Sequence, residues 1–277
     1  MRFTKMHGAG NDYVYIDCMK GAPAHPEQLA ISMSDRHFGI GSDGLVLILP
    51  SQVADFRMRM FNADGSEAQM CGNASRCVGK YVYDNGLTDK TEITLETKAG
   101  IKPMRLTVVD GKVSSVRVDM GEPMLEPIRI PVALSGGRAV AVPLELPGAA
   151  FTMTCVSMGN PHAVVFVPRL DEVDVHKWGP IAECHPLFPE RCNIEFAEVL
   201  SPEEITLRVW ERGAGETLAC GTGACATLVA AVLNGLAGRS ARLRLLGGNL
   251  DITWSDDDNH VYMSGGAVTV FDGEWLL

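Results

Sequence analysis

The chain has 277 residues, of which 46% are hydrophobic and 21% are charged, a composition typical of globular proteins with a substantial core. At roughly 150 residues per domain, the length predicts about two domains. The 34 acidic residues outnumber the 24 basic ones and give a formal charge of −10. This balance argues against nucleic acid or a membrane as a partner, because phosphates and anionic lipids are bound by basic surfaces.

No segment has the pattern of a targeting signal or a membrane span. The first residues, Met1–Gly8, contain no apolar run, so we expect no secretory signal and a cytoplasmic protein. The segment from Thr217 to Gly238 carries no charge, but its apolar part, Ala224–Leu236, is well short of the ~20 residues that cross a bilayer. We expect this part to form a buried helix.

Hydrophobic periodicity predicts many short strands and few helices. Helices are expected at Glu27–His37 and in the two segments that follow Cys71 and Cys220, each of which ends at an Asn-Gly pair typical of a helix end. The predicted strands, in chain order, are Tyr13–Asp17, Leu45–Leu49, Ile93–Thr97, Val113–Asp119, Ala163–Val167, Ile205–Trp210, Ala241–Leu246 and Val261–Ser264.

The sequence repeats itself at a constant offset of 149 residues. Met70–Leu87 and Ala219–Leu236 share a Cys-Gly pair near their start and Asn-Gly-Leu at their end, without a gap. We interpret the chain as two pseudo-symmetric halves, 1–119 and 120–265, with 266–277 returning to the first half. Short strands and one apolar helix per half favour a mixed α+β fold, an alpha-beta roll in which a mostly antiparallel sheet or barrel surrounds a central helix.

The eight cysteines indicate neither a disulfide framework nor a zinc site. Without secretion, thiols are expected to stay reduced, and no pair has the C-x₂-C spacing of a structural zinc site, so we expect no metal. A free cysteine is most often a small buried hydrophobic residue. We expect this role for six of them, Cys18, Cys77, Cys155, Cys184, Cys192 and Cys225.

The other two cysteines, Cys71 and Cys220, each stand just before a predicted helix, with Asn73 or Thr222 near the N-cap. The N–H groups and the positive dipole end of a helix lower the pKa of a nearby thiol and bind a carboxylate. Two such thiols suit the inversion of a carbon next to a carboxylate. One thiolate removes the proton from one face, and the other thiol delivers a proton to the opposite face, without pyridoxal or any other cofactor.

Four motifs resemble those of the diaminopimelate epimerases, the cofactor-independent amino-acid epimerases of lysine and peptidoglycan synthesis. The resemblance covers essentially the whole chain. Phe61–Cys77 and Glu211–Gly223 are similar to the two active-site motifs of the family, and His7–Asp12 and Gly159–His162 are similar to the loops that accompany them. One departure is Gly44, where some family members carry glutamine, so a side-chain contact from this loop is lacking.

The resemblance implies a role for each matched residue. Cys71 and Cys220 would be the acid–base pair that interconverts LL- and meso-diaminopimelate, and His162 and Glu211 would tune the thiols or contact the substrate. It also implies a homodimer whose small-molecule substrate is diaminopimelate. The substrate-binding residues implied are Asn11, Asn62, Gly72, Asn73, Asn160, Asn193, Glu211, Arg212, Gly221 and Thr222.

These binding residues divide between the two ends of the substrate. The helix-start residues of each motif would hold the carboxylate of the reacting centre. The asparagines and Arg212 would hold the distal amino-acid end, since the arginine fork suits a carboxylate and asparagine supplies both donors and acceptors.

Three other classes of protein compete with this interpretation. A racemase of another amino acid on the same fold would have little use for Arg212 and four asparagines around a second zwitterion. A dinucleotide-binding reductase is suggested by the glycines of Gly39–Gly44 and Gly221–Ala226. However, the first segment leads from helix to strand, and the second lacks an acidic residue about 20 positions on. The third is a redox protein with a Cys71–Cys220 disulfide, a bond that we expect to inactivate an epimerase.

Overall fold

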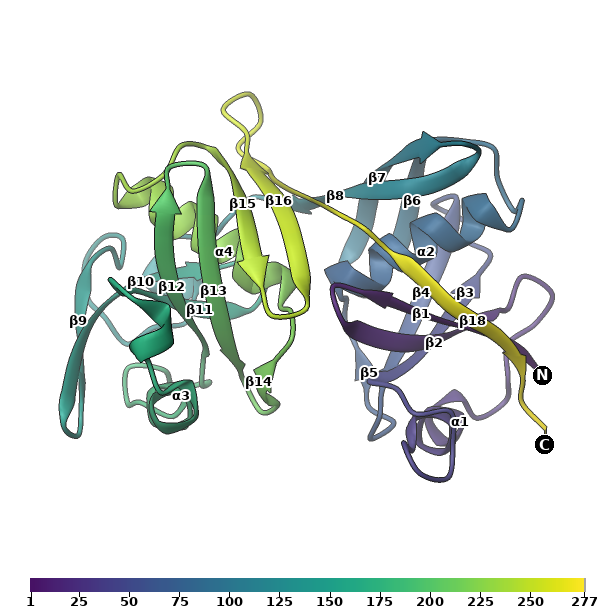
Figure 1. The fold of residues 1–277 in the computed structure, drawn as a ribbon, viewed down its shortest axis with the longest axis horizontal. Helices are drawn as coiled ribbons and strands as arrows, with labels where there is room; N and C mark the ends of the chain where they lie inside the picture. The colour runs from purple at the N-terminus through teal and green to yellow at the C-terminus, as the bar shows by residue number, and fades with distance from the viewer. Residues whose placement is uncertain (277) are drawn as a thin grey trace. The chain divides into compact units, whose positions relative to one another are not determined.

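The computed structural model describes residues 1–276 and divides the chain into two compact units. The first consists of Met1–Asp119 with Ser264–Leu277, and the second of Met120–Met263. Each unit is built mainly of strands, and one long buried helix lies against the strands of its own unit (Figure 1). The described residues therefore form a mixed α/β fold dominated by sheet, which confirms the predicted fold class.

In the first unit the strands pair in the order β18–β1–β2–β3–β4–β6–β7–β8, and β5 pairs with the C-terminal end of β4. Only β2–β3 and β4–β6 are parallel among these pairs. The tail strand β18, yellow in Figure 1, lies beside the purple β1. The elements are β1 Arg2–Gly8, β2 Asn11–Asp17, α1 Pro26–Ser34, β3 Gly44–Leu49, β4 Phe56–Asn62, β5 Glu67–Ala68, α2 Gly72–Asp84, β6 Glu92–Thr97, β7 Gly100–Val109, β8 Lys112–Gly121 and β18 Val268–Glu274.

In the second unit the strands pair in the order β9–β10–β11–β12–β13–β15–β16, with β14 on β13. Here β11–β12 and β13–β15 are the parallel pairs. The elements are η1 Pro127–Arg129, β9 Val142–Leu146, β10 Ala149–Ser157, β11 Pro161–Phe166, η2 Leu170–Glu172, α3 Val175–Glu183, β12 Asn193–Ser201, β13 Glu204–Glu211, β14 Gly215–Thr217, α4 Gly221–Leu233, β15 Ser240–Leu245, β16 Gly248–Trp254 and β17 Val261–Gly265.

The sequence repeat has a structural counterpart at the same offset. Helix α4 begins and ends 149 residues after α2. The register of a parallel strand pair also recurs at this offset, because Tyr13 pairs with Gly44 on β2–β3 and His162 pairs with Asn193 on β11–β12. An ion pair also recurs across each hairpin that leads to a candidate cysteine. It joins Arg59 Nε to Glu67 Oε1 at 2.7 Å and Arg208 Nε to Glu216 Oε1 at 2.6 Å.

The helices α2 and α4 end where the sequence predicts. Asn85 and Asn234 are the C-cap residues, and Gly86 and Gly235 follow with φ of 70° and 67°, a conformation that favours glycine. Most side chains of α4 are buried, so its apolar surface faces the core on all sides. Among the described residues, no helix is long and apolar enough to cross a membrane.

Every predicted strand is present, with ends shifted by at most two residues. The structure differs from the prediction in one helix end, in one additional helix and in several additional strands. Helix α1 ends at Ser34 and not at His37, because the Asp35 carboxylate accepts the backbone N–H groups of His37 and Phe38 and turns the chain. Helix α3 was not predicted, and it contains an internal proline, Pro180. Many strands were also missed, including β1, β4, β7, β10, β12, β16 and β18.

The cysteines other than Cys71 and Cys220 are free thiols, and the expectation that all six are buried is wrong for one of them. Cys184 is exposed because it is the C-cap residue of α3, on the surface of its unit. The remaining five are buried in the cores, as predicted: Cys18, Cys77, Cys155, Cys192 and Cys225.

Candidate active site

Both candidate catalytic cysteines occupy the N-cap position of a buried helix. Cys71 precedes α2 and Cys220 precedes α4, each with extended backbone angles. Helical hydrogen bonding begins with Ser75 N–H to Cys71 O and Ala224 N–H to Cys220 O, both at 2.9 Å. The amide groups ahead of these bonds belong to the first helical turn, whose N–H groups have no partner in the helical ladder and can bind an anion.

Asn73 and Thr222 lie near the N-caps, as predicted, and the cap residues are the cysteines themselves. Asn73 lies in the first turn of α2, where its Oδ1 accepts a hydrogen bond from Arg76 Nη2 at 2.9 Å. Thr222 lies in the first turn of α4, with its Oγ1 3.4 Å from Cys220 Sγ. The cap of α4 is completed by Gly223 N–H, which donates to the same sulfur at 3.4 Å.

In the first unit, Asn11 connects Cys71 to a carboxylate. Asn11 opens β2 after a tight turn in which Gly10 has a φ of 83°. Its Oδ1 accepts from Cys71 Sγ at 3.4 Å, and its Nδ2 donates to Asp43 Oδ2 at 2.7 Å. Because an ionised carboxylate only accepts hydrogen bonds, Asp43 fixes which end of the Asn11 amide faces the thiol.

A cluster of charges holds Asp43 in place. Arg36 Nη2 donates to both Asp12 Oδ1 and Asp43 Oδ1 at 3.0 Å, and Lys5 pairs with Asp12 at 2.5 Å. Burial favours a raised pKa for Asp12, but the hydrogen bonds and charges of Lys5 and Arg36 outweigh it and lower the pKa. Burial, and with it the neighbouring Asp12 charge, raises the pKa of Asp43.

Cys220 is buried, with only 5% of its surface exposed. Burial raises the pKa of its thiol well above the ordinary value of 9.0, and the carboxylates of Glu211 and Glu195 act in the same direction. Hydrogen bonds with Thr222 and Gly223 oppose this shift. The start of α4 acts in the predicted direction through Gly223 N–H, but desolvation and two nearby carboxylates outweigh it at Cys220.

A buried histidine lies beside these groups in the second unit. His162 Nδ1 is 2.7 Å from Glu195 Oε1, and both side chains are fully buried. On its other side, His162 Nε2 is 3.1 Å from Asn160 Oδ1. Asn160 Nδ2 in turn donates to Thr222 Oγ1 at 3.3 Å. These contacts place the predicted residues His162 and Asn160 within one hydrogen-bonded chain that reaches the start of α4.

Glu211 lies at the end of β13, in the position that Asn62 occupies at the end of β4. The hydroxyl of Thr217 donates to its carboxylate. Burial raises the pKa of Glu211, while the bond from Thr217, the charge of His162 and a hydrogen bond with Cys220 oppose the shift. Glu211 is therefore in direct contact with the thiol that it is expected to tune.

Two of the residues expected at the distal end of the substrate, Asn193 and Arg212, are positioned by contacts with the backbone. Asn193 donates from Nδ2 to Pro161 O at 2.7 Å, and its Oδ1 accepts from Arg212 N–H at 2.9 Å. Arg212 Nη1 donates to Glu190 O at 2.9 Å, on the exposed side of the unit. In the first unit, Asn62 Nδ2 donates to the Ser66 hydroxyl at 3.0 Å.

Sequence reasoning missed two carboxylates that support the predicted residues, Asp43 and Glu195. Glu195 had a readable signal, because it is a single acidic residue inside the otherwise apolar strand segment Ile194–Ala197. Asp43 had no such signal, since an aspartate beside Gly44 is typical of a turn. At Gly44 itself an added Cβ would lie 2.0 Å from Phe61 O, so this position has no room for a side chain.

A comparison with protein-family models matches the chain to the diaminopimelate epimerase model over residues 3–126 and 154–270. The chain belongs to the diaminopimelate epimerase family. The members of this family are isomerases. Both candidate cysteines, and every residue predicted to surround them, fall within the matched segments.

Named relatives of the family match along almost the whole chain. The diaminopimelate epimerase of Acetivibrio thermocellus is 61% identical over 274 residues, which cover 99% of this chain and 98% of the relative. That of Desulfovibrio desulfuricans is 60% identical and covers 100% of this chain and 99% of the relative. That of Methanococcus maripaludis is 56% identical, with 99% of each chain covered.

Solved structures of lower identity share the fold. A phenazine biosynthesis protein of the PhzF family from Bacillus anthracis has a TM-score of 0.73 at 18% identity, covering 100% of this chain and 99% of its own. A probable proline racemase from Agrobacterium radiobacter has a TM-score of 0.74 at 17% identity, covering 100% of this chain and 93% of its own.

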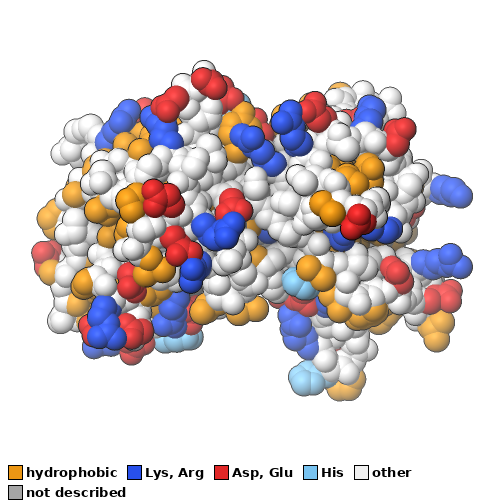
Figure 2. Space-filling view, turned by 45° about the horizontal axis from the view of Figure 1, so that its top comes forward, with side chains coloured by type: hydrophobic (Ala, Val, Ile, Leu, Met, Phe, Trp, Pro, Cys, Tyr) orange, Lys and Arg blue, Asp and Glu red, His pale blue; other side chains and the backbone are white. Residues whose placement is uncertain are grey.

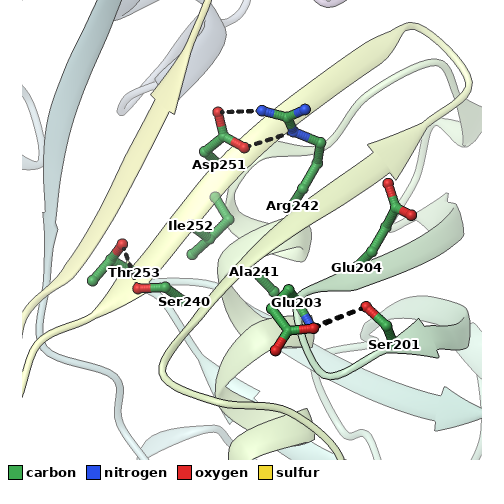
Figure 3. Close-up of a pocket in the computed structure, with 9 residues that line it drawn as sticks. All are labelled: Ser201, Glu203, Glu204, Ser240, Ala241, Arg242, Asp251, Ile252 and Thr253. Atoms are coloured by element: carbon green, nitrogen blue, oxygen red, sulfur yellow. Dashed lines mark hydrogen bonds and ion pairs between the residues drawn. The ribbon is translucent and has the colours of Figure 1, made fainter.

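A surface pocket elsewhere in the second unit contains none of the predicted family site residues. Figure 3 shows it on β15, β16 and the β12–β13 turn, where Arg242 Nε is 2.8 Å from Asp251 Oδ1 and Glu203 accepts from the Ser201 hydroxyl at 3.2 Å. On the face drawn in Figure 2, acidic and basic side chains are interspersed. Among residues 1–276 no group of three or more His, Cys, Asp or Glu side chains is arranged to hold a metal ion.

Proposed function

We propose that this chain interconverts LL- and meso-diaminopimelate with Cys71 and Cys220 as its two acid–base groups. The observation that carries the proposal is the matched position of the two thiols. Each is the N-cap residue of a helix, and the two helices begin 149 residues apart in a repeated structure. The near-complete match to diaminopimelate epimerases supports the choice of substrate.

In the proposed reaction one cysteine is a thiolate and the other a thiol when the substrate binds. The thiolate takes the proton of the α carbon and becomes a thiol. The opposite thiol then gives its proton to the other face of the same carbon and becomes a thiolate. The number of protons on the pair is unchanged, and the enzyme that releases product is ready for the reverse reaction. The mechanism requires both sulfurs to reach opposite faces of one carbon.

The helix starts supply the electrostatic part of the proposed mechanism. Removal of the α proton places negative charge on the adjacent carboxylate. The N–H groups of Gly72 and Asn73, and those of Gly221 and Thr222, belong to the first turns of α2 and α4 and can donate to this carboxylate. Such donors stabilise the carbanion more than the substrate, because the charge grows as the proton leaves.

The distal amino-acid end would be held by Arg212 and the asparagines. Arg212 reaches the exposed side of its unit, where its guanidinium is available for a carboxylate in two-point contact. Asn11, Asn62, Asn160 and Asn193 supply donors and acceptors for the distal ammonium and carboxylate. The alanine variant of Arg212 should raise KM for diaminopimelate strongly, while the alanine variant of the exposed Arg169 should not.

His162 and Glu211 are proposed to adjust the acidity of Cys220. Support comes from the hydrogen bond of Glu211 with this thiol and from the chain of contacts that joins His162 to it. Cys71 has a different neighbour, the amide oxygen of Asn11. The two thiols would therefore have different resting affinities for a proton.

We also propose that the protein is a homodimer in the cytoplasm. The dimer is supported by apolar side chains exposed on β18, among them Val268, Val270 and Phe271. Sedimentation analysis tests it, and a monomer at micromolar concentration would contradict it.

The activity is tested by assaying epimerisation from each stereoisomer with C71A, C220A and the control C184A, whose thiol is exposed and outside the site. Loss of one proton-transfer group should lower kcat by at least ~10²-fold, and the control should keep full activity. Activity on a single-headed amino acid, with none on diaminopimelate, would favour the alternative racemase.

A further inference from the structure

Glu195 is a fully buried carboxylate with one charge partner. Its Oε1 lies 2.7 Å from His162 Nδ1, and its Oε2 accepts no hydrogen bond from the described residues. An unpaired charge in a protein core is strongly unfavourable. The histidine ring is therefore the group that compensates this carboxylate.

Room for this carboxylate depends on Gly223, in the first turn of α4. A Cβ added at Gly223 would lie 2.6 Å from Glu195 Oε1. The carboxylate thus packs against the start of the helix whose cap residue is Cys220. Glu195 makes no hydrogen bond to the sulfur among the described residues, so beyond the through-space effect of its charge, any effect on the thiol passes through other groups.

The contacts from Glu195 to Cys220 form a directed chain. A carboxylate accepts, so His162 Nδ1 carries a hydrogen. His162 Nε2 is 3.1 Å from the amide oxygen of Asn160, a contact in which the ring donates when it carries a second hydrogen. Asn160 then donates from Nδ2 to Thr222 Oγ1 at 3.3 Å, and the Thr222 hydroxyl keeps its own hydrogen for Cys220 Sγ at 3.4 Å.

We propose that Glu195 is a positioning residue that keeps hydrogen on both ring nitrogens of His162 and thereby directs this chain toward the Cys220 sulfur. With both hydrogens present, every link donates in the direction of the sulfur, which favours the thiolate and opposes the effect of burial on Cys220. If Nε2 loses its hydrogen, the Asn160 amide turns over, the Thr222 hydroxyl donates to it, and the Thr222 oxygen then accepts from the thiol form of Cys220.

Other charged and titratable groups face the Glu195–His162 pair, but none of them supplies a cation that could replace the His162 ring. Glu211 on β13 is a second carboxylate near His162. Cys155 on β10 and Cys192 before β12 are buried thiols that the charge of Glu195 makes harder to ionise. The charge of Arg212 acts on Cys192, but no ion pair joins it to Glu195 among the described residues.

This inference, which rests on the proposed role of Cys220, is tested by two measurements that do not require catalytic turnover. The first is ¹⁵N NMR of histidine-labelled protein at neutral pH. His162 should carry hydrogen on both ring nitrogens in the wild type and on one in E195Q. A singly protonated His162 in the wild type would overturn the proposal whether or not the variant folds.

The second readout is the rate at which iodoacetamide alkylates Cys220, measured by mass spectrometry. Losing a donor that favours the thiolate should slow alkylation by about tenfold in E195Q. A carboxylate acting alone, as an unpaired negative neighbour, predicts the opposite sign, so faster or unchanged alkylation contradicts the proposal. The control E198Q alters the same strand, at a carboxylate that accepts Leu170 N–H at 2.8 Å, and should leave the rate unchanged.

The chain itself is tested by combining E195Q with Thr222→Val, which removes the relaying hydroxyl, and with Thr222→Ser, which keeps it. In the valine background E195Q should have no further effect, whereas in the serine background its effect should persist. Additive effects in the valine background would show that Glu195 acts by another route. If the wild type failed to epimerise diaminopimelate, the proposed function would fall while these thiol measurements still decided the role of Glu195.

Discussion

The side-chain nitrogen of Asn11 donates to the carboxylate of Asp43 at 2.7 Å. This contact leaves the amide oxygen of Asn11 facing Cys71 Sγ at 3.4 Å. In the second unit the matching residue, Asn160, is oriented by His162 instead. The repeat therefore conserves the asparagine next to each helix start but changes the group that orients it, which gives the two thiols different surroundings.

Replacing Asp43 by asparagine tests the orientation of Asn11. The Asp43→Asn side chain can donate as well as accept, so the Asn11 amide loses its fixed direction and Cys71 loses a reliable acceptor. We expect kcat to fall by about tenfold, the effect of one lost hydrogen bond to a charged group. Asp17→Asn, at the exposed end of β2, the strand that Asn11 opens, should leave kcat unchanged. A kcat within twofold of wild type for Asp43→Asn would show that Asp43 does not act on the site.

Gly44→Ala should destabilise the first unit. A Cβ at this position meets Phe61 O at 2.0 Å, so β3 and β4 must separate. Forced overpacking costs about 1–3 kcal/mol, and urea unfolding should report a loss in this range. Gly137→Ala is a matched control, because nothing lies within 4 Å of an added Cβ there and its φ is not positive. Equal stability of the two variants would refute the clash.

Stability should fall at alkaline pH because of buried thiols. Burial raises the pKa of Cys77 to about 11 and that of Cys155 to about 12, from an ordinary value of 9.0. Between pH 9.0 and these raised values the unfolded chain has lost protons that the folded chain still holds. The free energy of unfolding therefore decreases as pH rises. The contribution is complete below pH 9.0 and is lost as pH rises toward the folded values.

Urea titrations from neutral pH to about pH 11, with reductant present, measure this dependence. Cys155→Ala should make the decline shallower by removing one of the groups that cause it. The exposed Cys184→Ala is the control and should leave the slope unchanged. A slope that is the same in all three proteins would mean that Cys155 ionises alike in the folded and unfolded chains.

The sequence predicted the parts of the fold that depend on local pattern. The two helices after the cysteines, their Asn-Gly ends and the apolar strands all follow from periodicity and caps. It did not predict α3, because Gly179 and Pro180 are unfavourable inside a helix and packing against Trp210 overrides them. Strand β18 was missed as well, since most of its side chains are exposed and no alternation of buried and exposed residues marks it.

For the candidate site, the motifs located the cysteines but not their electrostatics. A helix start alone predicts a more acidic thiol, yet the pKa of Cys220 is raised by burial and by Glu211 and Glu195, which come from other strands. Such terms depend on tertiary contacts. Glu195 and Asp43 were missed for the same reason, because their importance lies in the residues that they touch.

The central claim is that Cys71 and Cys220 act on opposite faces of one α carbon. It is tested by incubating C71A and C220A separately with LL- and meso-diaminopimelate in D₂O and following both deuterium at the α carbon and its configuration. Each variant should fail to epimerise but should exchange the α proton, with retention, of only the isomer that its remaining thiol faces, and the two variants should select opposite isomers. Epimerisation by either variant, or exchange of the same isomer by both, would contradict the two-thiol mechanism.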